Sequence, residues 1–146
     1  MARVELRWIG AIDVDSDGYG SGRTNIAGYT VEVDLELEDA CEVPTTEELD
    51  WLRVAPNQLW SGVSSRIRSD ARSDMSEVQA YLQHHAREIG RSFEIHDIIP
   101  LSLGISGSCG EFECVLDCGL GFDLSQYVLA FNFSCDGEIL GVSFES

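Results

Sequence analysis

Three aspartates at alternate positions stand where a divalent cation could be held. The run from Asp13 to Gly18, D-V-D-S-D-G, matches the first half of a calcium loop, with glycine at the sixth position. The twelfth position is Thr24, where such a loop requires a bidentate glutamate, and the flanking residues resemble strands. Asp13, Asp15 and Asp17 are candidate metal ligands, but a polar hairpin loop is the preferred interpretation and we expect no bound metal.

Five cysteines form a second set of groups that could do chemistry. None of them has the C-x-x-C spacing of a zinc knuckle, so a zinc site is not indicated. Cys109 lies in a turn-like Gly-Ser-Cys-Gly run, and His96 could approach it as a base, which makes Cys109 a candidate nucleophile. Cys114 and Cys118 alternate with polar residues and should be small apolar core residues. We expect free thiols.

The charge of the chain limits the classes of function. Its 26 Asp and Glu residues outnumber 9 basic residues, all of them arginine, and the net charge is −17. Without lysine there can be no Walker-type phosphate loop and no Schiff-base chemistry. Nucleic acids and anionic membranes attract basic surfaces, so the chain should bind neither directly. With no catalytic signature, we expect neither an enzyme nor a cofactor, and a basic protein as partner.

The sequence also bears on location. Residues 1–8 alternate charged and apolar side chains, a pattern that does not predict a signal peptide. The longest apolar run, residues 127–131, is far shorter than the ~20 residues that span a bilayer. We therefore expect a cytoplasmic protein that does not enter membranes.

A single α+β domain over residues 1–146 would position these groups. Residues 4–14 predict a strand with Val4, Leu6 and Trp8 on one face, and residues 15–25 are turn-forming throughout. The regular alternation of residues 27–39 predicts a half-buried strand. Its buried face should carry Tyr29, Val31, Val33, Leu35 and Leu37, and its exposed face Glu32, Asp34, Glu36 and Glu38.

Three helices should follow. The first opens at residues 44–48, where Thr45 and Glu48 have capping-box spacing. The second follows Pro56 and the third covers residues 76–89, ending at Gly90. Their apolar stripes predict core residues, and the position of His85 on the third stripe predicts a core histidine. These stripes comprise Leu59, Trp60, Val63 and Ile67 in the second helix, and Met75, Val78, Leu82, His85 and Ile89 in the third.

The last third returns to strands. Strands are predicted at residues 93–103, with a bend at Pro100, at residues 112–118, and at residues 127–134, which are apolar on both faces as in a central strand. After an Asp-Gly turn, Leu140, Val142 and Phe144 should line the inward face of the final strand. The order ββ-ααα-ββββ predicts a mostly antiparallel sheet of about six strands with helices packed on one face.

The excess charge is confined to the strand segments. Residues 1–43 carry a net −7 and residues 92–146 a net −9, whereas the helical residues 44–91 carry only −1. Salt adaptation would spread carboxylates over the helices as well, so this division favours an acidic docking face. Glu32, Asp34, Glu36 and Glu38 are its most regular part and are the candidate partner-binding residues. A charged sheet face that prevents aggregation is the alternative.

The C-terminal segment consists of an apolar strand, Tyr127 to Phe133, an Asp136-Gly137 turn and a second apolar strand ending at Ser146. These 20 residues resemble the closing hairpin of small bacterial immunity proteins of polymorphic and contact-dependent toxin systems. The resemblance implies a cytoplasmic protein that blocks a toxin without chemistry of its own, and it assigns no role to any single residue.

Taken together, these features predict an acidic inhibitor or immunity protein that masks the basic active-site surface of a toxin, such as a nuclease. Two alternatives remain open. One is a nucleic-acid mimic that blocks a DNA-binding enzyme, with carboxylates spaced like phosphates. The other is a small cysteine-dependent enzyme or redox protein built around Cys109.

Overall fold

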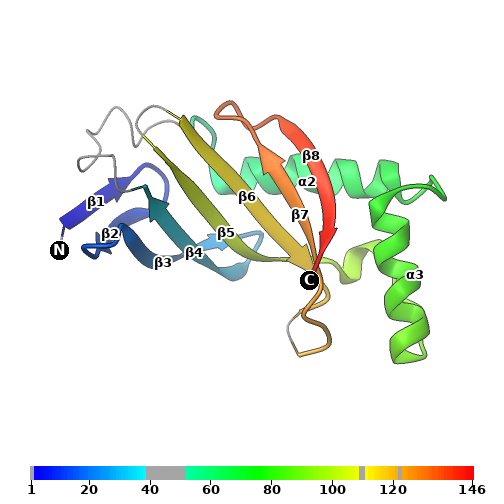
Figure 1. The fold of residues 1–146 in the computed structure, drawn as a ribbon. Coiled ribbons are helices and arrows are strands. Elements are labelled where there is room, and N and C mark those ends of the chain that lie inside the picture. The colour runs from blue at the N-terminus through cyan, green and yellow to red at the C-terminus, as the bar shows by residue number, and fades with distance from the viewer. Residues whose placement is uncertain (1, 39–51, 109–110, 122) are drawn as a thin grey trace.

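The computed structural model describes residues 2–38, 52–108, 111–121 and 123–146. These residues form one eight-stranded sheet in which the strands lie side by side in their sequence order, β1 to β8 (Figure 1). Within the described residues, two helices and a short 3₁₀ helix, η1, come between β4 and β5 in the chain. All neighbouring strands are antiparallel except β4 and β5, which are parallel. Parallel neighbours need a long crossover, and the helical segment supplies it.

The predicted α+β class and mostly antiparallel sheet are confirmed, but the count of six strands is wrong. The first predicted helix, at residues 44–48, lies outside the described residues. No helix within the described ranges is long and apolar enough to cross a membrane. The elements are β1 (Ala2–Leu6), β2 (Gly10–Val14), β3 (Tyr19–Ile26), β4 (Tyr29–Leu37), α2 (Pro56–Asp70), α3 (Glu77–Ile89), η1 (Ile95–Asp97), β5 (Ile99–Ser108), β6 (Glu111–Gly119), β7 (Val128–Phe133) and β8 (Ile139–Glu145).

The single strand predicted for residues 4–14 is in fact a hairpin. A turn between β1 and β2 reverses the chain, and Trp8 takes a positive φ of 75° there. Val4 and Leu6 are buried as predicted, but Trp8 is 49% exposed because it belongs to the turn and not to the strand face. The alternation of apolar residues continues through this turn, so the pattern by itself does not reveal it.

The turn-like residues 15–25 contain a strand, β3, that composition did not predict. Its glycines allow close packing: a Cβ on Gly20 would lie 2.6 Å from the Ile12 side chain, and one on Gly22 would lie 3.2 Å from it. Glycine is therefore needed here because the two strands approach closely. In the sequence, the same glycine-rich run looks like a turn.

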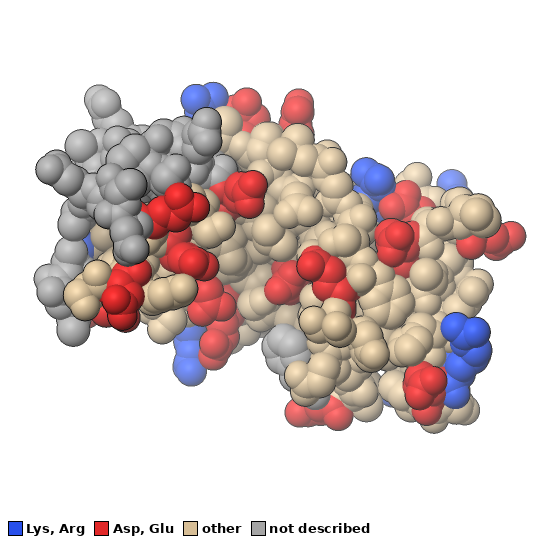
Figure 2. All heavy atoms as spheres, viewed as in Figure 1, with Lys and Arg blue, Asp and Glu red and all other residues tan. Residues whose placement is uncertain are grey.

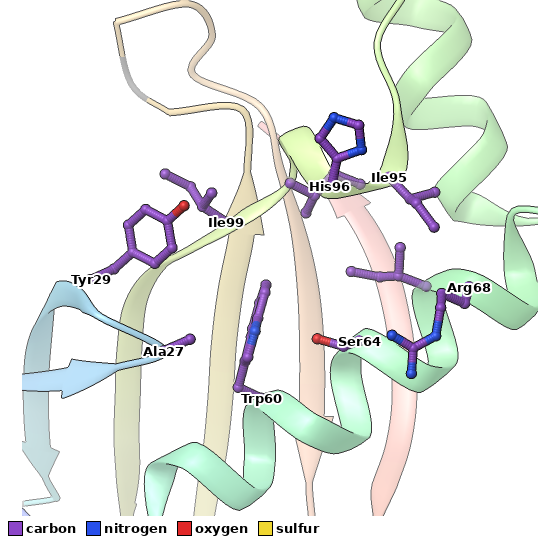
Figure 3. Close-up of a pocket in the computed structure, with 10 residues that line it drawn as sticks. Ala27, Tyr29, Trp60, Ser64, Arg68, Ile95, His96 and Ile99 are labelled. Atoms are coloured by element: carbon purple, nitrogen blue, oxygen red, sulfur yellow. The ribbon is translucent and has the colours of Figure 1, made fainter.

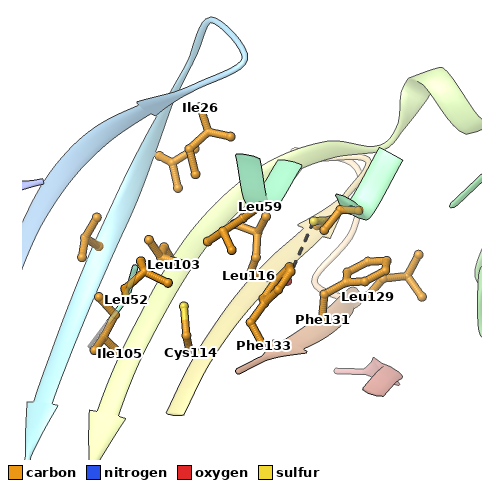
Figure 4. Packing of buried hydrophobic residues seen from close by; sticks show 14 of the residues in the cluster. Ile26, Leu52, Leu59, Leu103, Ile105, Cys114, Leu116, Leu129, Phe131 and Phe133 are labelled. Atoms are coloured by element: carbon orange, nitrogen blue, oxygen red, sulfur yellow. Dashed lines mark hydrogen bonds between the residues drawn. The ribbon is translucent and has the colours of Figure 1, made fainter. Parts of the chain in front are cut away.

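Strand β4 has the predicted register. Val31, Val33, Leu35 and Leu37 are buried, and the intervening carboxylates are exposed. Tyr29 is the exception, at 43% exposure, because it is the first residue after the β3–β4 turn and lies at the end of the sheet. In Figure 4, Leu59 of α2 lies close to Leu103 and Leu116 of the sheet in the same apolar cluster.

The helices confirm most of the predicted stripes. In α2, Leu59, Val63 and Ile67 are buried and Trp60 is half-buried. Helix α3 begins after Ser76, whose hydroxyl accepts the Gln79 N–H, and it ends at Gly90 in the left-handed conformation. Met75 is 93% exposed because it precedes the N-cap, so its predicted place in the core is wrong, and Ile89 in the last turn is also exposed.

Two details of the C-terminal strands differ from the prediction. Strand β5 begins only at Ile99, since η1 occupies residues 95–97, and the register shifts at Pro100, where a bend was expected. Leu140 is 69% exposed and does not face inward. Phe133 pairs with Ile139 and Asn132 with Gly141, so Leu140 is the extra residue of a β-bulge. The β7 strand lies between two partners, as its apolar faces predicted.

Candidate partner-binding face

The predicted carboxylate row lies on the side of the sheet opposite α2 (Figure 1). Glu32, Asp34 and Glu36 alternate with buried residues of β4 and are exposed, and Glu38 is exposed just beyond the end of the strand. The backbone N–H of Glu38 donates to the Gly107 carbonyl at 3.0 Å, which ties the end of the row to β5. Figure 1 shows this side of the sheet towards the viewer, with α2 behind it.

The neighbouring strand β5 presents only small residues to this side. Glu32 lies beside Ser102, Asp34 beside Gly104 and Glu36 beside Ser106. Beyond β5, Ser102 pairs with Asp117 and Ser106 with Glu113 of β6. Two interstrand spacings, about 10 Å, therefore separate the two sets of carboxylates across a floor of Ser and Gly. We call Glu32, Asp34, Glu36, Glu113 and Asp117 the acidic face.

A space-filling view of the same side shows where charged side chains lie (Figure 2). Acidic atoms are spread over the sheet, and arginine atoms appear at the periphery of this view (Figure 2). Two arginines contact carboxylates near the N-terminal edge: Arg23 lies 4.0 Å from Glu32, and Arg3 lies 3.5 Å from Asp13. All four side chains are at least 61% exposed, so these pairs contribute little to stability and leave most of the negative charge uncompensated.

A hollow of about 670 Å³ opens at the β2–β4 end of the acidic face. Asp13 and Asp15 line it from β2 and the turn after it, Asp34 from β4, and Tyr19 and Ser21 from β3. The tertiary structure therefore joins two aspartates of the calcium-like run to a member of the partner-binding row. Sequence spacing gave no sign of this, because β3 lies between the two segments.

The calcium-like run forms a hairpin turn. One oxygen of Asp15 accepts the backbone N–H groups of Asp17 at 2.9 Å and Tyr19 at 3.0 Å, as in an Asx turn. Among the described residues, no three His, Cys, Asp or Glu side chains are close enough to hold a metal ion. The polar hairpin loop preferred from the sequence is confirmed.

Asp117 is the least exposed carboxylate of the acidic face. Burial raises the pKa of its carboxyl group above the ordinary value, and the charges of Glu145 and Asp34 raise it further. A hydrogen bond from the Ser102 hydroxyl at 3.2 Å acts in the opposite direction. On the other side of β5, the Tyr19 hydroxyl donates to Glu36 at 3.1 Å. The charge of Asp34 on β4 thus contributes to the raised pKa of Asp117 on β6 from across β5.

The cysteine candidates give little support for thiol chemistry. Cys109 lies outside the described residues, so its approach to His96 is not described. Cys114 and Cys118 are free, buried thiols, as the alternation predicted. Burial raises the pKa of Cys114 to about 12 and that of Cys118 well above its usual value, which keeps both protonated and unreactive. Cys135 is free and half-buried.

His85 and Ser125 form the described contact that most resembles a catalytic pair. The His85 ring lies 2.6 Å from the Ser125 hydroxyl, and its other nitrogen lies 2.7 Å from the Tyr81 carbonyl. His85 is only 2% exposed, and the Ser125 hydroxyl already accepts the Tyr127 N–H at 3.0 Å. The contact therefore anchors the β6–β7 loop to α3, in agreement with the predicted core histidine.

Among the described residues, negative charge is thus most concentrated on the acidic face and around its hollow. Their side chains can attract and pair with cations, above all the guanidinium and ammonium groups of another protein. Compared with known proteins, the chain matches no family model, no curated protein and no solved structure.

Proposed function

We propose that this protein is a binding protein whose acidic face docks onto a basic surface of a partner protein. The observation that carries the proposal is the placement of five carboxylates on one face of the sheet, across a floor of Ser and Gly. Like charges held this close repel one another, and a basic partner would relieve that repulsion on binding. The self-repulsion is a cost to folding that a docking role explains.

The hollow beside Asp34 gives the face a place for a single anchoring side chain. Its aspartates come from two separate segments, so they can approach a guanidinium from two sides. Arginine pairs with carboxylates through two parallel hydrogen bonds, which fixes orientation as well as adding energy. We expect the central contact of the interface to be an arginine of the partner inserted between Asp13 and Asp34.

The partner we favour is a basic toxin, such as a nuclease. Nucleases need basic surfaces to hold phosphates, and a protein that covers such a surface inhibits without chemistry. The hairpin that resembles immunity proteins forms β7 and β8, and it adds Glu145 beside the acidic face. Electrostatic attraction would speed the encounter, with association rates up to about 10⁸–10⁹ M⁻¹s⁻¹ at low salt.

The test compares two double variants with the same change in net charge. Asp34→Arg with Glu36→Arg reverses the acidic face, and Asp74→Arg with Glu88→Arg reverses two exposed carboxylates of the helical segment. A partner captured from the native host should lose association rate with the first variant and keep it with the second. Rates should also fall as salt shortens the Debye length to about 8 Å.

Three results would contradict the proposal: a partner that is itself acidic, equal effects of the two double variants, or kinetics indifferent to salt. If the partner is a DNA-binding enzyme and duplex DNA competes for the same surface, the nucleic-acid mimic is the correct form of the proposal. If the partner is a toxin, adding this protein should block its activity at a one-to-one ratio.

A further inference from the structure

A second concave site lies between α2, the β3–β4 turn and η1 (Figure 3). Its volume is about 500 Å³, within the range of roughly 300–1,000 Å³ that small-molecule sites occupy. It shares no residue with the hollow of the acidic face. The Ala27 N–H donates to the Asn57 side chain at 2.8 Å, and this bond holds the β3–β4 turn against the start of α2. The wall of the pocket is therefore tied in place.

Most of the lining is apolar. Trp60 projects from α2 into the pocket, and Tyr29 and Ile99 face it from the opposite side (Figure 3). Ile67 and Ile98 are buried, so the deeper part of the pocket is also apolar. A ligand that covers this surface would gain about 25 cal/mol for each Å² of apolar area removed from water. The body of the ligand should therefore be an aromatic ring or a branched hydrocarbon.

The polar side of the pocket is cationic. Ser64 and Arg68 project from successive turns of α2, on the same side as Trp60. Within the described part of the chain, the Arg68 guanidinium has no carboxylate within 4.0 Å, and its contact is the Ser65 hydroxyl at 3.4 Å. Arg66, two residues earlier, is bound to Asp70 at 2.9 Å.

An available guanidinium is notable in a chain of net charge −17. None of the described residues that line the pocket is acidic. His96 also lines the pocket, but its ring nitrogens lie 3.2 Å from Glu94 and 3.9 Å from Asp97. These two carboxylates would neutralise a positive charge on the ring. Arg68 thus remains the one lining cation without an acidic neighbour among the described residues, and it suits a single carboxylate.

We propose that this pocket binds a small monocarboxylate with an apolar body. The body lies against Trp60 and the isoleucines, and the carboxylate pairs with Arg68 beside the Ser64 hydroxyl. This proposal is independent of the acidic face. It uses different residues, and its ligand is an anion, whereas the acidic face is proposed to bind a basic partner.

The probe is 4-phenylbutyrate, compared with its neutral amide, 4-phenylbutyramide. Two-dimensional NMR of the ¹⁵N-labelled full chain maps the residues whose signals shift. Saturable shifts should be confined to α2, η1 and the β3–β4 turn, and the acid should bind about tenfold more tightly than the amide. In Arg68→Gln this difference should disappear. Trp60→Leu should weaken binding of acid and amide alike.

Arg66→Gln is the matched control, because it removes an arginine of the same helix that does not line the pocket. It should leave the preference for the acid unchanged, and the NMR spectrum of each variant reports directly whether it is folded. Equal binding of acid and amide to the wild type would overturn the proposal, as would shifts centred outside the pocket. So would the absence of saturable shifts up to about 20 mM for 4-phenylbutyrate, phenylacetate and isovalerate.

Discussion

His85 and Ser125, which are 40 positions apart in the chain, meet at 2.6 Å between the imidazole Nε2 and the hydroxyl oxygen. The Tyr81 carbonyl can only accept, so the Nδ1 atom that faces it at 2.7 Å carries a proton and donates to it. The Tyr81 hydroxyl extends the network by donating to the Tyr127 carbonyl and accepting the Leu120 N–H. Helix α3 thereby holds the loop that connects β6 and β7.

Removal of His85 should be costly for this reason. His85→Ala leaves a cavity and unsatisfied buried groups, so the free energy of unfolding should fall by roughly 2–4 kcal/mol. His84→Ala is the control. His84 is half-buried beside the same aromatic rings, yet its side chain makes no hydrogen bond to another described residue. Urea denaturation measures both variants. An equal loss for the two histidines would contradict the anchoring role of His85.

The acidic face makes a prediction about pH. Because the pKa of Asp117 is raised in the folded state, its contribution to stability is complete below the unfolded pKa of about 3.9 and is lost as the pH rises through the folded value. Asp117→Asn cannot ionise, so near neutral pH its free energy of unfolding should exceed that of the wild type. The advantage should vanish as the pH falls below about 4.

The control for Asp117 is Glu113→Gln, which removes one exposed charge from the same face of the same strand. Any general relief of repulsion is common to both variants, so the difference between their stability curves isolates the effect of burial. Urea titrations at several pH values provide the curves. A larger gain near neutral pH for Glu113→Gln than for Asp117→Asn would show that burial of Asp117 is unimportant.

The thiols should differ in reactivity according to burial. Cys114, with a pKa of about 12, and the fully buried Cys118 should resist iodoacetamide in the folded protein, and half-buried Cys135 should react faster. Site-resolved mass spectrometry gives each rate, and unfolding in guanidinium should make the rates equal. Rapid labelling of Cys114 in the folded protein would mean that β6 opens readily.

Two glycines test the geometry of the turns at the two ends of β3. Gly18 and Gly28 have positive φ values of 88° and 86°, so alanine is strained at both. A Cβ at Gly18 would also overlap the Leu37 carbonyl, whereas one at Gly28 meets open space. Gly28→Ala should cost about 1–2 kcal/mol and Gly18→Ala clearly more. Thermal and urea unfolding measure the stability of both variants. An equal loss of stability would mean that the β2–β3 turn does not pack against the end of β4.

The parts of the fold whose signals are local could be predicted from the sequence. The alternation in β4 predicted which residues are buried and which carboxylates are exposed, because successive side chains of a strand point to opposite faces. Ser76 and Gly90 marked both ends of α3, since capping depends on a few adjacent residues. The separation of charge between strand and helical segments was also readable from composition.

Features that depend on contacts between distant residues could not be predicted and became visible only in the folded chain. The turn at Trp8 and the bulge at Leu140 both fall within a continuing apolar alternation, so the sequence pattern does not mark them. The glycines of β3 look like turn residues until Ile12 is seen packed against them. Each of these features is a response to a neighbour that the local pattern does not contain.

The candidate sites follow the same division. The row of β4 carboxylates was predicted, but its extension across β5 to Asp117 depends on the parallel pairing of β4 with β5. The placement of Asp13 and Asp34 around one hollow and the pocket around Arg68 likewise require segments brought together by the fold. Charge and periodicity are properties of the chain, whereas a concave site is a property of how its surfaces meet.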